Sequence, residues 1–248
     1  MTSVRLLVLG NGAAGAEKQA LTLAARLRTV HDVTPELLKE QGIKWSGELE
    51  EKLQGRRTRV VWLLGGPCRG FAFTAQDAER MVDEFVNALS NDVVVLVTFS
   101  RRTPKDVQRI IRNGLYERFT EPGQVLMWDG TEKRNPYYAL LSTASYIVTT
   151  PDSISMTTEA IASGKPVLTI GVEHCKGKFQ RFHQALFKVN ATTPFTRDAV
   201  VAALQRCAAG SDFRQENTAS STLEKEISMI VDAIVDSVHV AIDKIEAS

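Results

Sequence analysis

Residues 146–170 read YIVTTPDSISMTTEAIASGKPVLTI, and this stretch decides the fold class. Two short apolar runs, Tyr146–Thr149 and Pro166–Ile170, have the continuous hydrophobicity of buried parallel strands. Between them lies a helical segment, Met156–Ser163, followed by Gly164 at the position of a C′ glycine. A strand, a helix and a second strand in succession predict a β-α-β unit of a parallel sheet.

The same alternation extends from this unit toward the start of the chain. Further apolar runs predict strands at Val4–Leu9, Val60–Leu64, Val93–Thr98 and Val125–Trp128. Further periodic segments predict helices at Ala16–Leu27, Thr74–Leu89, Pro104–Leu115 and Pro136–Thr143. The pattern therefore predicts an α/β fold, with a Rossmann-like parallel sheet covered by helices on both faces.

Two segments depart from this rhythm and suggest the domain organisation. Thr34–Gly55 is polar and helical in pattern, and a linker-like Gly-Arg-Arg sequence closes it. We therefore expect three units, at 1–58, 59–221 and 222–248. The last, Thr222–Ser248, has aliphatic residues at helical spacing, typical of an amphipathic helix. It either packs on its own domain or forms an interface with a partner or a second copy of the chain.

Composition excludes several classes of protein. Of the 248 residues 44% are hydrophobic and 24% are charged, an ordinary globular mixture. The net charge of +1 lacks the basic excess of a typical nucleic-acid binder. Three widely spaced cysteines provide neither a disulfide framework nor zinc-ligand spacing, and no apolar run is long enough to span a membrane. We expect a cytoplasmic protein without a metal site or transmembrane segment.

The loop between the two strands quoted above is the most informative candidate site. Asp152, Ser153 and Ser155 stand where a strand passes into a helix, so any of them can cap the helix. Backbone N–H groups at the positive end of a helix dipole suit a phosphate or pyrophosphate. Glu159, in the first turns of the helix, could accept hydrogen bonds from ribose hydroxyls. Ordinary helix capping explains the same residues equally well.

Three other loops also follow predicted strands. Gly65-Gly66 could let the backbone approach a ligand or could simply form a tight turn. Ser100 and Arg101, followed by a second arginine, could bind phosphate or form a solvated basic turn. Asn135 precedes a helix that begins with proline, where capping is the simpler explanation. In an open α/β sheet ligands bind at the carboxyl ends of the strands, so these loops would converge on one crevice if the strand order allows.

Several segments together resemble a known family. They are GNGAAGAEKQALTLAARL (10–27), GGPCRGFAFT (65–74), TFSRRTP (98–104), NPYYALLSTASYIVTTPDSISMTTEAIASGKPV (135–167) and KFQRFHQAL (178–186). This set is similar to the mitochondrial fission family, whose plant member is known by an elongated-mitochondria phenotype. That family resembles the GT-B architecture of glycosyltransferases and nucleotide-sugar epimerases, in which two Rossmann-like domains face each other across a cleft.

The resemblance has consequences for the site. It implies that residues 59–221 correspond to the GT-B C-terminal-type domain, which binds the nucleotide diphosphate. Ser153, Ser155 and Met156 would then lie at the pyrophosphate and Glu159 at the ribose. Gly65, Gly66, Ser100 and Arg101 would line the same cleft. The ligand expected from the resemblance is a nucleotide diphosphate or a UDP-sugar.

The resemblance also bears on function. Only one βα unit and a polar helix precede residue 59, so the N-terminal domain is expected to be a shortened remnant. GT-B chemistry uses both domains, which favours a binding or recruitment factor in mitochondrial fission over an enzyme. A nucleotide-sugar-dependent glycosyltransferase or epimerase is the alternative. The resemblance further suggests a peripheral position at the mitochondrial outer surface and a dynamin-like or self-association partner for the C-terminal helix.

Overall fold

The computed structural model describes residues 33–53, 55, 58–132 and 134–208. The helices are α2 (Pro35–Leu53), α3 (Ala75–Ala88), α4 (Lys105–Arg118), α5 (Tyr137–Thr143), α6 (Ile154–Ala162), the 3-10 helix η1 (Val172–His174), α7 (Lys178–Lys188) and α8 (Arg197–Ala208). The strands are β1 (Arg59–Leu64), β2 (Val94–Phe99), β3 (Val125–Trp128), β4 (Tyr146–Thr149), β5 (Val167–Thr169) and β6 (Thr193–Pro194).

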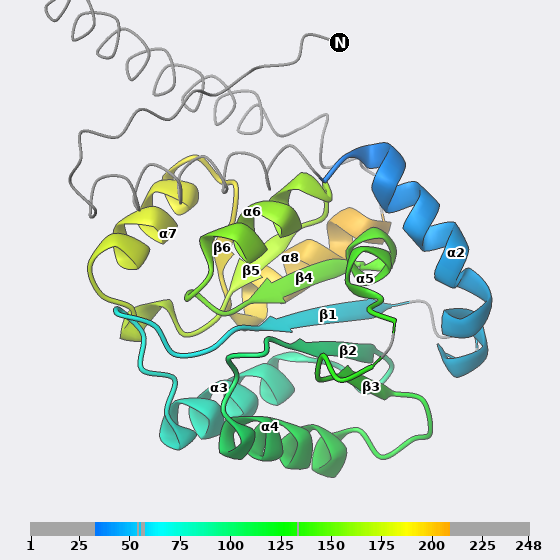
Figure 1. Ribbon diagram of the computed structural model, residues 1–248, viewed down its shortest axis with the longest axis horizontal. Helices are drawn as coiled ribbons and strands as arrows, with labels where there is room; N and C mark the ends of the chain where they lie inside the picture. Colours follow the sequence, from blue (N-terminus) through cyan, green and yellow to red (C-terminus); the bar gives the residue numbers. More distant parts are fainter. Residues whose placement is uncertain (1–32, 54, 56–57, 133, 209–248) are drawn as a thin grey trace, which may run out of the picture.

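These strands form one parallel sheet in the order β3-β2-β1-β4-β5-β6. The central strand β1 pairs with β2 on one side and with β4 on the other, so Trp62 lies between Val97 and Val148. In Figure 1 the arrowheads of β1 and β4 point to the left, which is the carboxyl edge of the sheet. The predicted α/β class with a parallel, Rossmann-like sheet is confirmed.

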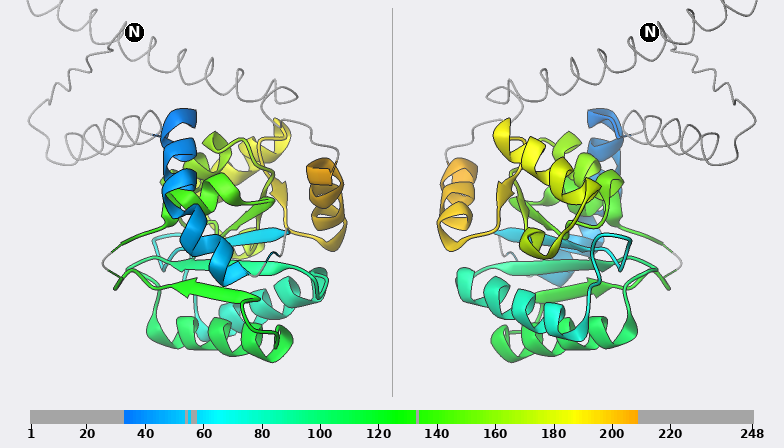
Figure 2. Two further views of the ribbon diagram at one scale, coloured as in Figure 1. Left: turned by 90° about the vertical axis from the view of Figure 1, so that its right-hand side faces the viewer. Right: turned by 90° about the vertical axis from the view of Figure 1, so that its left-hand side faces the viewer.

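The strands alternate their side chains between two hydrophobic cores, as parallel strands buried on both faces must. Val60, Trp62 and Leu64 of β1 point into a core shared with α3, α4 and α8. Val61 and Leu63 point into the other core, which α2, α5 and α6 help to form. Both rotated views show helices on either side of the sheet (Figure 2). Trp62 stacks on Phe85 of α3 with ring centroids 4.0 Å apart.

Helix α2 confirms the helix predicted from its polar sequence, and it packs on the sheet. Four side chains along one face, Leu38, Trp45, Leu49 and Leu53, are buried. They join the core of α5 and the centre of β1. The Arg134 guanidinium lies over the Trp45 ring, 4.3 Å from its centre. Residues 35–53 therefore share a core with the parallel sheet.

Some predictions differ from the structure, and others lie outside its described residues. Strand β2 is shifted by one residue from the predicted Val93–Thr98, while β6 and α8 were not predicted. Both residues of β6 are exposed, so no apolar run marks this strand. The predicted strand Val4–Leu9 and the helices Ala16–Leu27 and Thr222–Ser248 lie outside the described residues, and the unit boundaries stay predictions. In the described part of the chain, no helix is long and apolar enough to cross a membrane.

Candidate functional site

The strand order places a topological switch point between β1 and β4. From β1 the chain proceeds outward to β2 and β3, and then returns to the other side of β1 with β4. The loops that follow β1 and β4 therefore leave the sheet side by side at its carboxyl edge (Figure 1). Ligands of open α/β sheets bind at such a point. The two glycines and the serine-rich loop singled out in the sequence both lie here.

The carboxylate of Asp152 ties three of these loops together. Its Oδ2 accepts hydrogen bonds from the Gly66 N–H at 2.8 Å and from the Arg102 guanidinium at 3.0 Å. Its Oδ1 accepts from the Thr150 hydroxyl at 2.7 Å. The Asp152 side chain is 0% exposed, whereas that of Arg102 is 50% exposed. Asp152 was predicted to contact a ligand, but its carboxylate is already occupied by three donors and positions the loops.

Both predicted glycines are in close contact with this network. A Cβ atom on Gly65 would lie 2.1 Å from the Asp152 carboxylate oxygens, and one on Gly66 would lie 2.4 Å from the Arg102 carbonyl oxygen. The Gly65 N–H donates to the Thr150 hydroxyl at 2.8 Å, and its carbonyl accepts from the Thr103 hydroxyl at 2.5 Å. Close approach between loops is therefore one physical reason for glycine at both positions.

The amino end of α6 lies directly after this network. Ser153 is the N-cap residue, and its hydroxyl accepts a hydrogen bond from the Met156 N–H at 3.3 Å. The Met156 side chain packs against the core, so only its backbone faces the helix end. The half-buried Ser155 hydroxyl makes no hydrogen bond to any described residue. The first-turn N–H groups of a helix have no intrahelical partner, so this end can accept an anion.

The two arginines after β2 have different surroundings. Arg102 binds Asp152 and also donates to the Pro67 carbonyl at 3.3 Å. Arg101 is exposed and has no ion-pair partner among the described residues. The Ser100 hydroxyl accepts from the Arg102 N–H at 3.2 Å and so shapes the turn. Of the residues predicted in this loop, Arg101 is thus the one whose charge is available to a ligand.

Asn135 and Glu159 are connected through a tyrosine that the sequence analysis did not single out. Asn135 stands just before Pro136, the N-cap of α5, and its Oδ1 accepts from the Tyr137 N–H at 3.0 Å. The Tyr137 hydroxyl donates to Glu159 Oε2 at 2.7 Å. Burial raises the pKa of the Glu159 carboxyl, and the Tyr137 hydrogen bond partly offsets this. Burial and the neighbouring Glu159 raise the pKa of Tyr137 as well.

The buried His183 of α7 is another contributor to the site. Its Nε2 lies 3.0 Å from the Pro151 carbonyl oxygen, so the imidazole holds the loop between β4 and α6. In the sequence, His183 stands in a basic stretch with Lys176, Lys178 and Arg181, a pattern that predicts either a border of the crevice or a solvated helix face. Only the fold brings it beneath Pro151.

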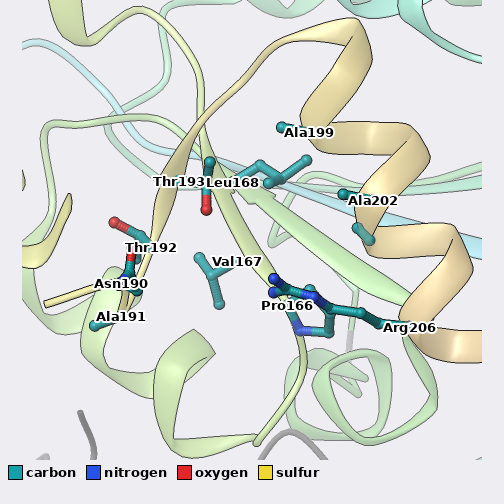
Figure 3. Close-up of a pocket in the computed structure, with 11 residues that line it drawn as sticks. Pro166, Val167, Leu168, Asn190, Ala191, Thr192, Thr193, Ala199, Ala202 and Arg206 are labelled. Carbon is teal, nitrogen blue, oxygen red and sulfur yellow. The ribbon is translucent and has the colours of Figure 1, made fainter. Parts of the chain in front are cut away.

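A separate pocket of about 100 Å³ lies away from these loops, between β5, β6 and α8 (Figure 3). Its walls are mostly apolar, with Leu168 and Ala202 among them, and Arg206 stands at one end. Pro166, the residue just before β5, lines this pocket, so the pocket lies toward the amino edge of the sheet. Among the described residues, no group of His, Cys, Asp and Glu side chains could hold a metal ion.

Comparison with known proteins identifies the family. A profile described as mitochondrial fission ELM1 matches residues 22–226, which is most of the chain. The chain belongs to the mitochondrial fission ELM1 family. The mitochondrial fission protein ELM1 of Arabidopsis thaliana is 33% identical over 137 residues, covering 55% of this chain and 31% of that protein. An uncharacterized protein of Rickettsia prowazekii (strain Madrid E) is 34% identical over 125 residues, covering 48% and 33%.

The match to these two relatives thus spans about a third of their length. Among solved structures, the α,α-trehalose-phosphate synthase (UDP-forming) of Burkholderia vietnamiensis superposes with a TM-score of 0.52 at 16% identity. That superposition covers 83% of this chain and 51% of the synthase. The similarity confirms a glycosyltransferase-like, GT-B-type fold for this ELM1-family chain.

Proposed function

We propose that this chain binds a nucleoside diphosphate or nucleotide sugar at the carboxyl edge of its sheet and acts as a binding or recruitment factor. The observation that carries the proposal is the meeting of the β1, β2 and β4 loops at the amino end of α6. There the Ser155 hydroxyl and Arg101, which have no hydrogen-bond or ion-pair partner among the described residues, remain available to a diphosphate. The UDP-forming structural neighbour supports the same ligand class.

Within this proposal the predicted residues divide into two groups. Ser153, Ser155, the amino end of α6 at Met156 and Arg101 would surround the diphosphate. Glu159 would face the ribose through the carboxylate oxygen that Tyr137 does not contact. Gly65, Gly66, Ser100, Asp152 and Arg102 would hold the loops in place, and Asn135 would hold Tyr137. The second group does not contact the ligand but keeps the residues of the first group in position to bind it.

Isothermal titration of the whole chain with UDP, GDP, CDP and ADP, and with UDP-glucose, tests the proposal. We expect at least one diphosphate to bind, and S155A and R101Q each to weaken that binding by about tenfold, the loss of one charge-assisted or polar contact. R109Q, an equally exposed arginine of α4, is the matched control and should bind like the parent chain. Absence of binding by every nucleotide at millimolar concentration would overturn the proposal.

One observation favours an enzyme as the second candidate. A buried carboxylic acid with a raised pKa, such as Glu159, is a candidate general acid or base. In a glycosyltransferase or epimerase of this fold it would lie beside the bound nucleotide sugar. Release of UDP from UDP-glucose, or interconversion of UDP-sugars, would be measured with the parent chain and with E159Q. Turnover that E159Q abolishes would establish the enzyme in place of the binding factor.

The recruitment part of the proposal concerns residues 222–248, which lie outside the described residues. A dynamin-like protein or a second copy of the chain is the proposed partner for this segment, as part of a role in mitochondrial fission. A pull-down with the full chain is compared with a pull-down with a chain that ends at residue 221. If both forms retained the partner, residues 222–248 would not be the interface.

A further inference from the structure

Four exposed cations lie on the two segments that border the crevice, the loop after β1 and the stretch that runs into α7, and we call them the cationic rim. Its members are Arg69, Lys176, Lys178 and Arg181. None of them has an ion-pair partner among the described residues. The nearby carboxylate of Glu173 is instead 3.1 Å from His174 Nε2. The chain as a whole has a net charge of only +1, so this concentration of positive charge is local.

A backbone contact joins the two segments that carry the rim. The Lys176 N–H donates to the Gly70 carbonyl at 2.8 Å, and Arg69 immediately precedes Gly70 in the chain. The contact is tight, because a Cβ atom on Gly70 would lie 2.7 Å from the Lys176 carbonyl oxygen. The backbones of the two segments that carry Arg69 and Lys176 are therefore in contact, and like charges on neighbouring segments favour a bound anion.

The second half of the rim begins α7. The Lys178 ammonium lies 5.1 Å from the centre of the ring of Phe179, a buried residue of the core, so its position is partly fixed. Arg181 stands three residues later, on the same face of the helix. Two rim residues thus lie on α7, and the other two lie on loops that a backbone hydrogen bond joins.

The rim borders the proposed nucleotide site on the side away from Arg101. Cys175, next to Lys176, has its Sγ 3.9 Å from the Pro151 carbonyl oxygen, just before Asp152 and the Ser153 cap. In the sheet, the loop after β5 that carries Lys176 flanks β4 on one side, whereas the β2 loop that carries Arg101 lies beyond β1 on the other. Cations thus lie on both sides of the α6 amino end.

This arrangement has more positive charge than a diphosphate at α6 would need. The helix end and Arg101 already serve the diphosphate, which leaves the rim for a second anionic group on the same ligand. Resting on the proposed function, we propose that the ligand is an anionic nucleotide sugar. It would be a nucleoside diphosphate whose sugar bears a carboxylate or phosphate that the rim binds.

The test compares two probes that differ in one group, UDP-glucose and UDP-glucuronate, by isothermal titration of the whole chain. We expect UDP-glucuronate to bind about tenfold more tightly, as one added charge-assisted contact allows. In K176Q/K178Q this difference should vanish while the affinity for UDP stays within about twofold of the parent value. K39Q/K44Q, which removes two exposed charges from α2, is the matched control and should retain the difference.

The outcomes separate this inference from the proposed function. Equal affinity for the two sugars, or a preference that K176Q/K178Q leaves intact, overturns the inference while UDP binding still supports the proposed function. No binding of any nucleotide overturns both. A second measurement tests the rim without a nucleotide. Inorganic phosphate at constant ionic strength should raise the Tm of the parent chain by about 2 °C and that of K176Q/K178Q by less, whereas equal rises would overturn the inference.

Discussion

A single carboxylate, that of Asp152, receives hydrogen bonds from groups on three different loops. Its replacement by alanine leaves the buried Gly66 N–H and Thr150 hydroxyl without an acceptor, and the Arg102 guanidinium without its anion. We expect D152A to lower the free energy of unfolding by about 3 kcal/mol, as removal of one partner from a buried ionic network does. Urea unfolding measures this loss.

The exposed Asp106 in the first turn of α4 provides the control for this variant. D106A should lose no more than about 1 kcal/mol, since it removes only a favourable charge near a helix amino end. If D152A unfolded at the same urea concentration as D106A, the three-loop network would not contribute to stability.

The buried His183 makes stability depend on pH. Burial lowers the pKa of this imidazole, and the hydrogen bond to the Pro151 carbonyl opposes that shift. As pH falls, the unfolded chain therefore takes up this proton before the folded chain does. The contribution of His183 to the free energy of unfolding is therefore complete above the pKa of histidine in the unfolded chain, about 6.5, and declines at lower pH. Urea midpoints between about pH 8 and pH 5 should fall less steeply in H183Q than in the parent chain. Identical slopes would contradict the prediction.

At the scale of elements, two glycines within helices have opposite predicted effects. A Cβ atom on Gly114 of α4 would lie 2.8 Å from Val82 Cγ2 of α3, whereas one on Gly47 of α2 would meet no atom within 4 Å. Because a β-branched valine cannot readily turn away, G114A should destabilise the chain by about 1–3 kcal/mol. G47A should stabilise it by about 0.5–1 kcal/mol, since alanine restricts the unfolded chain. Thermal unfolding of both variants checks the two signs, and a stabilised G114A would contradict close packing of α3 on α4.

The same scale shows what the sequence could predict. Continuous apolar runs such as Val60–Leu64 become strands, because only a sheet covered on both faces buries every side chain of such a run. Helix α6 begins two residues before its predicted start, at the Ser153 cap. Strand β6 has no comparable run, and neighbouring strands and backbone pairing define it instead. Helix α7 is marked by basic residues, while its buried residues Phe179, His183 and Leu186 are spaced among them.

For the candidate site, sequence position predicted the loops but not the contacts within them. Each predicted residue follows a strand or begins a helix, which the alternation of elements reveals. The pairing of Asp152 with Arg102 joins residues 50 positions apart, and that of Tyr137 with Glu159 joins residues 22 apart. Such pairs depend on strand order, which one sequence does not specify. Binding by these residues stays a prediction.

At the scale of the whole molecule, α2 should unfold together with the sheet. Leu49 is fully buried between α2, α5 and β1. L49A should lower the free energy of unfolding by about 2–5 kcal/mol, the cost of a cavity in a packed core, within a single transition. I43A, at a side chain of the same helix that is 66% exposed, should change it by less than about 0.5 kcal/mol. An early, separate transition in L49A would place α2 outside the cooperative unit.

The short strand β6 also affects how copies of this molecule meet. An open sheet exposes unpaired backbone groups along its outermost strands, where another chain can add and start aggregation. In the described part of the chain, one border consists of Thr193 and Pro194, and proline has no N–H to donate. A border this short, ending in a residue that cannot donate, is a poor template for an intruding strand. The molecule can thus keep a wide parallel sheet without extending it from copy to copy along this border.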